Sequence, residues 1–425
     1  MKLSECIAMN EAAYSPKEAW PFVNYLDTGS ITDNRIKAIQ RLELSKEKLP
    51  SRARRKVKPG DIVFSTVRPN QRHFGLLRDI PDNFLASTGF AVIRARDRIA
   101  DPCFLYWYLA QDRIVSHLHT IAEHSTSAYP SIRPADIGSL EVNLPPLPEQ
   151  RAIARVLGAL DDKIELNRRM NETLEAMAQA IFKDWFVDFG PVRAKAEGRA
   201  PYLPPALWNL FPDTLDDEGK PVGWTTYKLD DLASHYRATL SPSARPNRIY
   251  EHYSIPAYDA GNEPSIDLGS SIKSNKTIVP KGAILLSKIN PENKRVWLPN
   301  PSEDAPQVAS TEFLALKPLA PATRSVLYCL FKSLGFRTKM TALVTGTSRS
   351  HQRVPPKSLL VCDVLAANSK MLALFDEKVV PMMTRLLTNR RESRKLAQTR
   401  DILLPKLMSG EIHLRNAEKA VEPVA

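Results

Sequence analysis

Two long stretches of the chain have apolar residues at steps of three and four, the spacing of a helix that buries one face against a partner. The predicted contact positions of the first stretch, from about residue 149 to 188, are Leu160, Ile164, Asn167, Leu174 and Ile181. Those of the second, from about 366 to 408, are Phe375, Val379, Leu386, Leu396 and Leu403. We expect the two helices to pack on each other as an antiparallel coiled coil, in which a buried Asn167 would fix the register. Two ordinary core helices are the alternative.

Prolines delimit these helices. Pro145, Pro146 and Pro148 place the start of the first near Glu149, and Pro381 predicts a kink or a late start in the second. LDDKIE from Leu160 parallels FDEKVV from Phe375 at an offset of 215, whereas MAQ and LAQ further along match at an offset of 219. The growing offset predicts about four extra residues, close to one turn, in the second helix.

The segments ahead of the two helices resemble each other. KPGDIVFSTVRP at 58–69 matches PKGAILLSKINP at 280–291, an offset of 222. ASTGFAVI at 86–93 matches ASTEFLAL at 309–316, and FLYWYL at 104–109 matches VLYCLF at 326–331, at offsets of 223 and 222. Similar pieces in one order at a nearly constant offset indicate an internal duplication.

Each copy begins with a glycine turn and an apolar run, followed by a second strand and a short amphipathic helix, at 105–118 in one copy and 327–339 in the other. The prediction is therefore an α+β fold: two mixed α/β domains separated by two long helices, with a pseudo-twofold internal repeat. The expected segments are a first domain at 1–145, a first helix at 146–190, a proline-rich linker at 191–222, a second domain at 223–365, a second helix at 366–408 and a tail at 409–425.

Composition narrows the class of protein. The net charge of +12 favours a polyanionic partner, because Lys and Arg neutralise phosphates. Four scattered cysteines without a CxxC pair indicate free thiols in a reducing cytoplasm. The N-terminus lacks the apolar stretch of a signal peptide, and no run reaches the ~18 apolar residues of a membrane span. We expect a cytoplasmic protein with no membrane partner.

Catalytic motifs are missing from the sequence. The nearest string to the NPPF loop of adenine methyltransferases is Asn290-Pro291-Glu292-Asn293, which lacks the second proline and the aromatic residue. No GxxxxGK[ST] phosphate loop occurs, and the acidic residues Asp213 and Glu218 are too close together for a nuclease metal site. We therefore expect no catalytic residue, no metal and no cofactor.

Polar loops in the two copies are candidates for contact with DNA, because Arg, Lys, Asn and Gln read base edges and hydroxyls bind phosphates. The loops after the first apolar run contain Arg68, Asn70, Gln71 and Arg72 in one copy and Lys288, Asn290, Lys294 and Arg295 in the other. The loops ahead of the long helices contain Thr126, Ser127 and Tyr129 in one copy and Thr347, Arg349, His351, Gln352 and Arg353 in the other. Buried structural turns are the alternative interpretation of the latter loops.

Four segments carry a resemblance to a known family: LPPLPEQRAIARVLGALDDKIELNRRMNETLEAMAQAIFKDWFVDFGPVRAK (144–195), RAPYLPPALWNLFP (199–212), GKPVGW (219–224) and ILLPKLMSGEI (402–412). In combination they resemble the specificity subunits of type I restriction–modification enzymes. The resemblance implies that each α/β domain is a target recognition domain reading half of an asymmetric, bipartite site in double-stranded DNA.

It also implies that the helices set the unread spacer and dock two adenine-N6 methyltransferase (M) subunits, and that restriction (R) subunits join the full complex. The family's specificity subunit has no catalytic residues and binds neither the methyl donor nor ATP. A duplicated coiled-coil scaffold for protein–protein assembly, or the reader part of another methyltransferase-linked defence system, stay open as alternatives.

Overall fold

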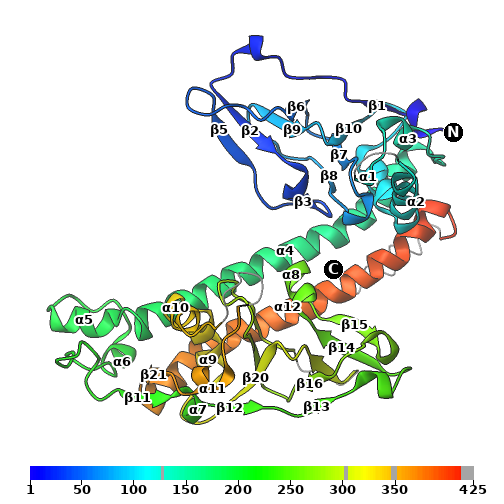
Figure 1. Ribbon diagram of the computed structural model, residues 1–425. Coiled ribbons are helices and arrows are strands. Elements are labelled where there is room, and N and C mark those ends of the chain that lie inside the picture. Colours follow the sequence, from blue (N-terminus) through cyan, green and yellow to red (C-terminus); the bar gives the residue numbers. More distant parts are fainter. Residues whose placement is uncertain (126–128, 301–304, 346–351, 413–425) are drawn as a thin grey trace. The chain divides into compact units, whose positions relative to one another are not determined.

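The computed structural model describes residues 1–125, 129–300, 305–345 and 352–412. The chain divides into two compact units, one formed by residues 1–166 with the segment from 393 onward, the other by residues 167–392. Each unit contains one α/β domain, called here the first head (1–145) and the second head (223–365). Both long helices pass from one unit into the other (Figure 1).

The first head has two four-stranded sheets. One has the antiparallel order β1 (Ile7–Met9), β10 (Phe90–Ala95), β7 (Ile62–Ser65), β8 (Phe74–Leu76). The other has the order β5 (Gln40–Glu43), β2 (Phe22–Leu26), β9 (Phe84–Ser87), β6 (Ala53–Lys56), with β2 and β9 parallel. The first head also contains β3 (Ile31–Thr32), β4 (Arg35–Ile36) and the α-helices α1 (Pro102–Ala110), α2 (Asp112–Glu123) and α3 (Pro134–Gly138).

The second head repeats this plan. Its first sheet has the order β12 (Ala233–Tyr236), β20 (Phe313–Pro318), β17 (Ile284–Ser287), β18 (Val296–Trp297). Its second has the order β13 (Thr239–Leu240), β16 (Lys276–Ile278), β19 (Gln307–Ala309), β14 (Ile249–Tyr253), β15 (Ser265–Leu268), with β14 and β19 parallel. Its helices are α7 (Leu229–Leu232), α8 (Ile255–Gly261), α9 (Arg324–Lys332), α10 (Leu334–Ala342) and α11 (Pro356–Leu360).

The internal repeat is confirmed by these elements. The first residues of β7 and β17 have an offset of 222, and so do those of α1 and α9 and those of α3 and α11. The predicted single amphipathic helix of each copy is wrong in one respect, because it is two helices. Gln111 and Ser333 have extended backbones, with ψ of 135° and 150°, and so end one helix and begin the next.

The long helices are α4 (Leu147–Phe186) and α12 (Ser369–Ser409). Their first residues have an offset of 222 and their last an offset of 223, so the predicted extra turn in the second helix is wrong. The LDDKIE and FDEKVV strings are locally similar but occupy positions about two turns apart. The late start is also wrong, since α12 is unbroken through Pro381. Pro381 is exposed, where water can bond the carbonyl that the proline leaves without a helical donor.

Within each unit, one half of α4 packs against the opposite half of α12 (Figure 1). In the first unit Leu157 and Leu160 share a core with Leu396 and Leu403, together with apolar residues of the first head. In the second unit the core residues from the helices include Ala178, Phe182, Trp185, Phe375, Val379 and Met383. The predicted seam is buried at Leu160, Ile164, Asn167, Phe375, Val379, Leu386, Leu396 and Leu403, while Leu174 and Ile181 are half-buried.

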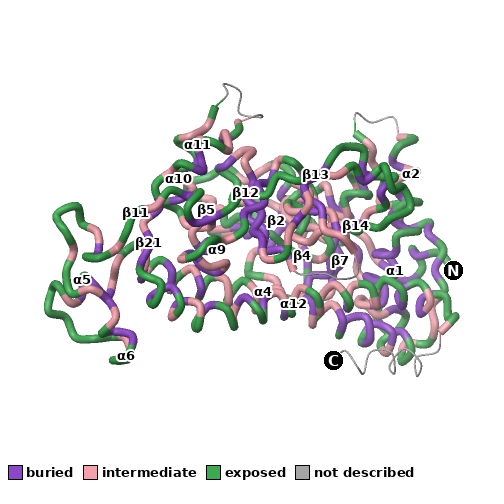
Figure 2. Tube along the Cα trace, turned by 90° about the horizontal axis from the view of Figure 1, so that it is seen from below, coloured by how far each residue is buried: buried purple, intermediate pink, exposed green. Residues whose placement is uncertain are grey.

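The segment predicted as a proline-rich linker is folded onto the second unit. It forms α5 (Gly190–Ala196) and α6 (Pro205–Trp208), and places Val192, Leu207 and Phe211 in the core of that unit. It then leads into β11 (Thr225–Lys228), which pairs with β21 (Asp363–Ala366) just ahead of α12. The alternation of buried and exposed positions along both long helices is visible in Figure 2. Among the described residues, no helix combines the length and apolar character needed to cross a membrane.

Candidate nucleic-acid interface

Two loops that are distant in the sequence lie side by side in the first head. The backbone N–H of Arg68 donates to the carbonyl of Pro130 at 2.9 Å, and that of Ile132 donates to Thr66 at 2.8 Å. A β-bridge joins Val67 to Ser131 between them. We call residues 66–72 with 129–132 the first loop pair. Both of its segments contain residues that the sequence predicts as DNA contacts.

The second head has the same arrangement at an offset of 222. The N–H of Asn290 donates to Gln352 at 2.9 Å, that of Val354 donates to Lys288 at 2.9 Å, and a bridge joins Ile289 to Arg353. We call residues 288–295 with 352–354 the second loop pair. The equivalence of every one of these bonds means that the two heads present the same backbone frame.

In the first loop pair, Arg68, Asn70 and Gln71 are exposed. The guanidinium of Arg68 lies over the ring of Tyr129, with 5.4 Å between its central carbon and the ring centroid. Tyr129 is itself 61% exposed. Two candidates from separate loops thus form one stacked pair on the surface.

Arg72 points the other way, into the fold. Its guanidinium donates to Asp33, to Asp112 at 2.8 Å and to the carbonyl of Ala110 at 2.8 Å. Burial opposes the charge, but the hydrogen bond and charge of Asp33 prevail and raise the pKa of Arg72. The side chain therefore joins the β3 region to the junction of α1 and α2.

Two arginines of the second loop pair are held by carboxylates. Arg295 donates to both oxygens of Asp259 at 2.7 and 2.8 Å, and Arg353 donates to both oxygens of Glu312 at 3.1 Å. The hydrogen bond that Arg353 donates to Glu312 raises the pKa of Arg353. Lys294 is exposed, whereas Lys288, Asn290 and Gln352 are half-buried. Thr126, Ser127, Thr347, Arg349 and His351 lie outside the described residues.

Sequence reasoning missed two neighbours of the second loop pair. Glu312, which accepts from Arg353, occupies the position that Gly89 has in the first head. The difference is visible in the sequence, where ASTEFLAL matches ASTGFAVI. His235 on β12 accepts from Arg237 at 3.2 Å. Burial lowers the pKa of His235, and the positive charges of Arg237 and Lys288 lower it further. The cationic surroundings suit an anion.

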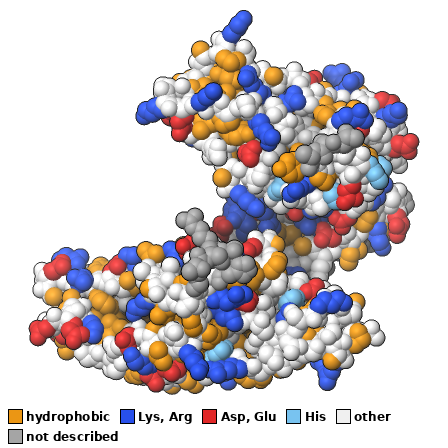
Figure 3. Space-filling model, viewed as in Figure 1, with side chains coloured by type: hydrophobic (Ala, Val, Ile, Leu, Met, Phe, Trp, Pro, Cys, Tyr) orange, Lys and Arg blue, Asp and Glu red, His pale blue; other side chains and the backbone are white. Residues whose placement is uncertain are grey.

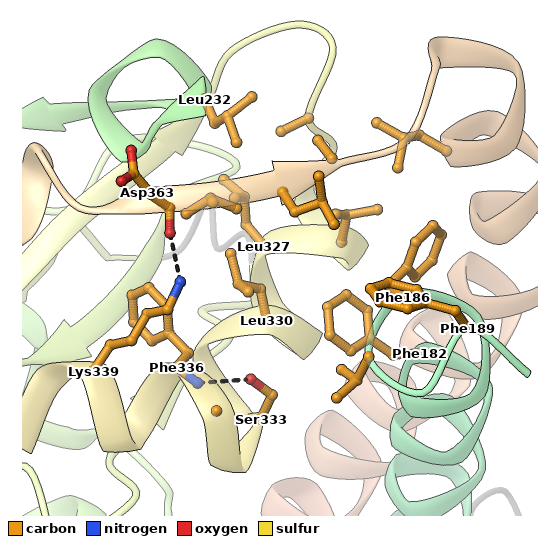
Figure 4. Close-up of a pocket in the computed structure, with 18 residues that line it drawn as sticks. Phe182, Phe186, Phe189, Leu232, Leu327, Leu330, Ser333, Phe336, Lys339 and Asp363 are labelled. Atoms are coloured by element: carbon orange, nitrogen blue, oxygen red, sulfur yellow. Dashed lines mark hydrogen bonds between the residues drawn. The ribbon is translucent and has the colours of Figure 1, made fainter. Parts of the chain in front are cut away.

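The second unit also has an apolar cavity of about 220 Å³, at the end of α4 (Figure 4). Phe182, Phe186 and Phe336 line it, and its polar groups are used within the fold. Lys339 donates to the carbonyl of Asp363 at 2.7 Å, and Ser333 accepts from the N–H of Phe336 at 3.2 Å. Since those polar groups are already bonded, the cavity has no evident catalytic constellation.

The described residues contain no cluster of three or more His, Cys, Asp or Glu able to hold a metal ion. On the face drawn in Figure 3, Lys and Arg side chains are spread over both units. The loop pairs remain candidate binding surfaces, because they combine guanidinium, amide, hydroxyl and aromatic groups on matching backbones.

Comparison with solved structures finds a protein with a similar fold. The crystal structure of the S subunit of a type I restriction–modification system from M. genitalium superimposes with a TM-score of 0.53 at 15% identity, over 96% of this chain and 95% of that one. This likeness supports a fold with two heads and two long helices.

Comparison with known sequences finds similar proteins of one kind. Residues 8–176 match the type I restriction modification DNA specificity domain. The chain is 28% identical over 449 aligned positions to the type I restriction enzyme HindI specificity subunit of Haemophilus influenzae, covering 93% of this chain and 95% of that one. It is 24% identical to the MjaIX specificity subunit of Methanocaldococcus jannaschii, over 77% of this chain and 72% of that one. Residues 8–176 thus resemble the family's DNA specificity domain, and most of the chain is similar to type I restriction enzyme specificity subunits.

Proposed function

We propose that this chain is the sequence-specific DNA-binding specificity subunit of a type I restriction–modification complex. Each head reads one half of a bipartite site in double-stranded DNA. The observation that carries this proposal is the matched frame of the two loop pairs, whose hydrogen bonds recur at an offset of 222. A duplicated frame with polar side chains is what two half-sites of one kind of ligand require.

The side chains on the two frames differ in chemistry, which supports an asymmetric site. Arg68 of the first head corresponds to Asn290 of the second, and Ser131 corresponds to Arg353. Arginine pairs with guanine and asparagine with adenine in the major groove, so the two frames would select different bases. Recognition of a palindromic DNA site would require the same residue at equivalent positions of the two heads.

The chain would supply recognition and assembly, and its partners the chemistry. We infer that two methyltransferase subunits and, in the full complex, restriction subunits bind to it, and that it uses no cofactor and has no catalytic residue. The related chains named above are specificity subunits of type I restriction enzymes, which supports this division of labour. The nearly equal helices α4 and α12 would set the gap between the half-sites.

Mapping of methylated adenines tests the proposal. The chain is co-expressed with the methyltransferase encoded beside it, in a host that lacks adenine methylation, and N6-methyladenine is located by single-molecule sequencing. We expect one motif made of two unlike halves with a fixed gap. A scaffold for protein assembly would give a complex whose methylation pattern does not change when either head is replaced, and that outcome would refute the proposal.

A further inference from the structure

Among the arginines of the two loop pairs, Arg68 differs in how its charge is used. Arg72, Arg295 and Arg353 each bind one or more carboxylates. Within the described residues Arg68 has no carboxylate partner, and its guanidinium lies over the exposed ring of Tyr129. Stacking on an aromatic face orients the planar guanidinium while leaving its N–H donors available.

The backbone at this position gives an independent argument. Arg68 has φ of 48° and ψ of 67°, a left-handed conformation, and it precedes Pro69. A Cβ makes this conformation costly, and a following proline disfavours helical backbone further. The equivalent residue of the second head, Asn290, also has positive φ, 46°, and also precedes a proline.

Asparagine is among the residues that tolerate a left-handed backbone best, and arginine is not. The backbone therefore explains Asn290 but not Arg68. The left-handed backbone does not account for the arginine at position 68, and what sets Arg68 apart from Arg98, whose φ is also positive, is its stack on Tyr129. The conformation aims the side chain outward, beside Tyr129.

We propose that Arg68, oriented by Tyr129, reads a guanine in the half-site of the first head, and this inference rests on the function proposed above. Two of its N–H groups would donate to the O6 and N7 acceptors of the guanine edge in the major groove. This bidentate pairing is the commonest specific contact between an arginine and DNA. Tyr129 acts as a positioning residue, since it holds the guanidinium plane and does not need to touch the base.

The test compares variants of the full chain in complex with its co-expressed methyltransferase, on a library of randomised DNA duplexes. Arg68→Asn installs the residue of the second head and relieves the backbone. We expect the preference for guanine at one position of one half-site to fall by roughly 5- to 160-fold, with the other half-site and the gap unchanged. Arg68→Lys keeps the positive charge but removes the planar pair of N–H donors, and it should lose much of the same preference for guanine.

The matched control is Arg98→Asn, because Arg98 is also exposed, belongs to the same unit and has positive φ, 64°, but lies outside the loop pair. Its methylation motif should equal that of the unaltered chain. Tyr129→Phe should keep the guanine preference and Tyr129→Ala should weaken it, at the same position as Arg68→Asn.

Three results would overturn the inference. If Arg68→Asn weakens methylation of all duplexes equally, Arg68 contacts a phosphate. If it changes nothing, Arg68 does not contact DNA. In both cases the unaltered chain still selects a bipartite motif, so the proposed function survives. If the unaltered chain selects no motif, the proposed function fails and the inference fails with it.

Discussion

Two arginines of one loop, Arg68 and Arg72, illustrate how neighbouring residues divide between surface and scaffold. Arg68 stacks on an exposed tyrosine, whereas Arg72 donates to two aspartates and a backbone carbonyl. From the sequence, both were equal candidates for contact with DNA. Their difference arises from partners that are distant in the sequence, Asp33 and Asp112 for Arg72 and Tyr129 for Arg68, which no local pattern reveals.

Arg72→Ala is therefore expected to act on stability. The carbonyl of Ala110 loses its side-chain donor and the ring of Phe74 loses the guanidinium that lies 5.3 Å from its centroid, at a cost of about 1–3 kcal/mol. The exposed pair with Asp112 adds little. A lower urea midpoint and faster amide exchange at Asp33, whose N–H donates to Arg72, would show this effect.

Arg98→Ala serves as the control for Arg72→Ala, since its exposed side chain should change stability by less than about 0.5 kcal/mol. A variant of Arg72 with unchanged stability but an altered methylation motif would show the scaffold role to be wrong and the residue to be a DNA contact.

At the scale of elements, the long helices meet through polar residues as well as apolar ones. In the second unit, the side-chain amide of Asn389 donates to Asn171 at 2.9 Å, and that of Asn167 donates to Glu392 at 2.8 Å. Asn389 and Asn167 are both buried and occupy equivalent positions, at the offset of 222 that relates the two copies. Buried asparagines of this kind cost stability but favour one register.

Periodicity predicted these helices well, because a packed helix must repeat its apolar positions every three to four residues. The comparison of repeated strings, by contrast, gave the wrong relative length for the two helices. Local similarity aligned FDEKVV with LDDKIE, whereas the packing aligns Asn389 with Asn167. The periodicity argument also missed Phe182 and Trp185, because those residues lie beside the seam and face the core of the second unit.

Because the helices match in length and offset, the function of a spacer is best tested by shortening both. Deleting Asp162–Glu165 together with Thr384–Leu387 removes equivalent segments from each, including one buried seam residue, Ile164 or Leu386. Each deletion corresponds to ~6 Å of helix, about two base pairs of duplex. We expect the gap in the methylated motif to shorten by about that amount, with both half-sites intact.

Deleting only Thr384–Leu387 is the comparison, because it shortens one helix while the other keeps its full length, and it should destabilise the protein instead. If the paired deletion altered the half-site sequences and left the gap unchanged, the helices would not act as the spacer.

At the scale of the molecule, the two heads share boundaries as well as topology. A bridge joins Lys2 to Glu141 at the base of the first head, and the ladder that begins at Lys228 and Asp363 closes the second. Chain entry and exit therefore lie next to each other at matched positions in both heads. Residues 228–363 can accordingly be replaced by residues 2–141 without opening a new gap in the chain.

Such a chain carries two copies of the first head on the antiparallel helix pair. If each head reads its own half-site, the methylated motif should become an inverted repeat of the half-site that the first head reads. The reciprocal exchange, with residues 228–363 in both places, should give the inverted repeat of the other half. Sequencing of N6-methyladenine in both strains measures the outcome, and helix content and unfolding midpoint verify that each chain folds. An unchanged asymmetric motif in a folded, doubled chain would contradict independent reading, because recognition would then require both heads to act jointly on each half of the site.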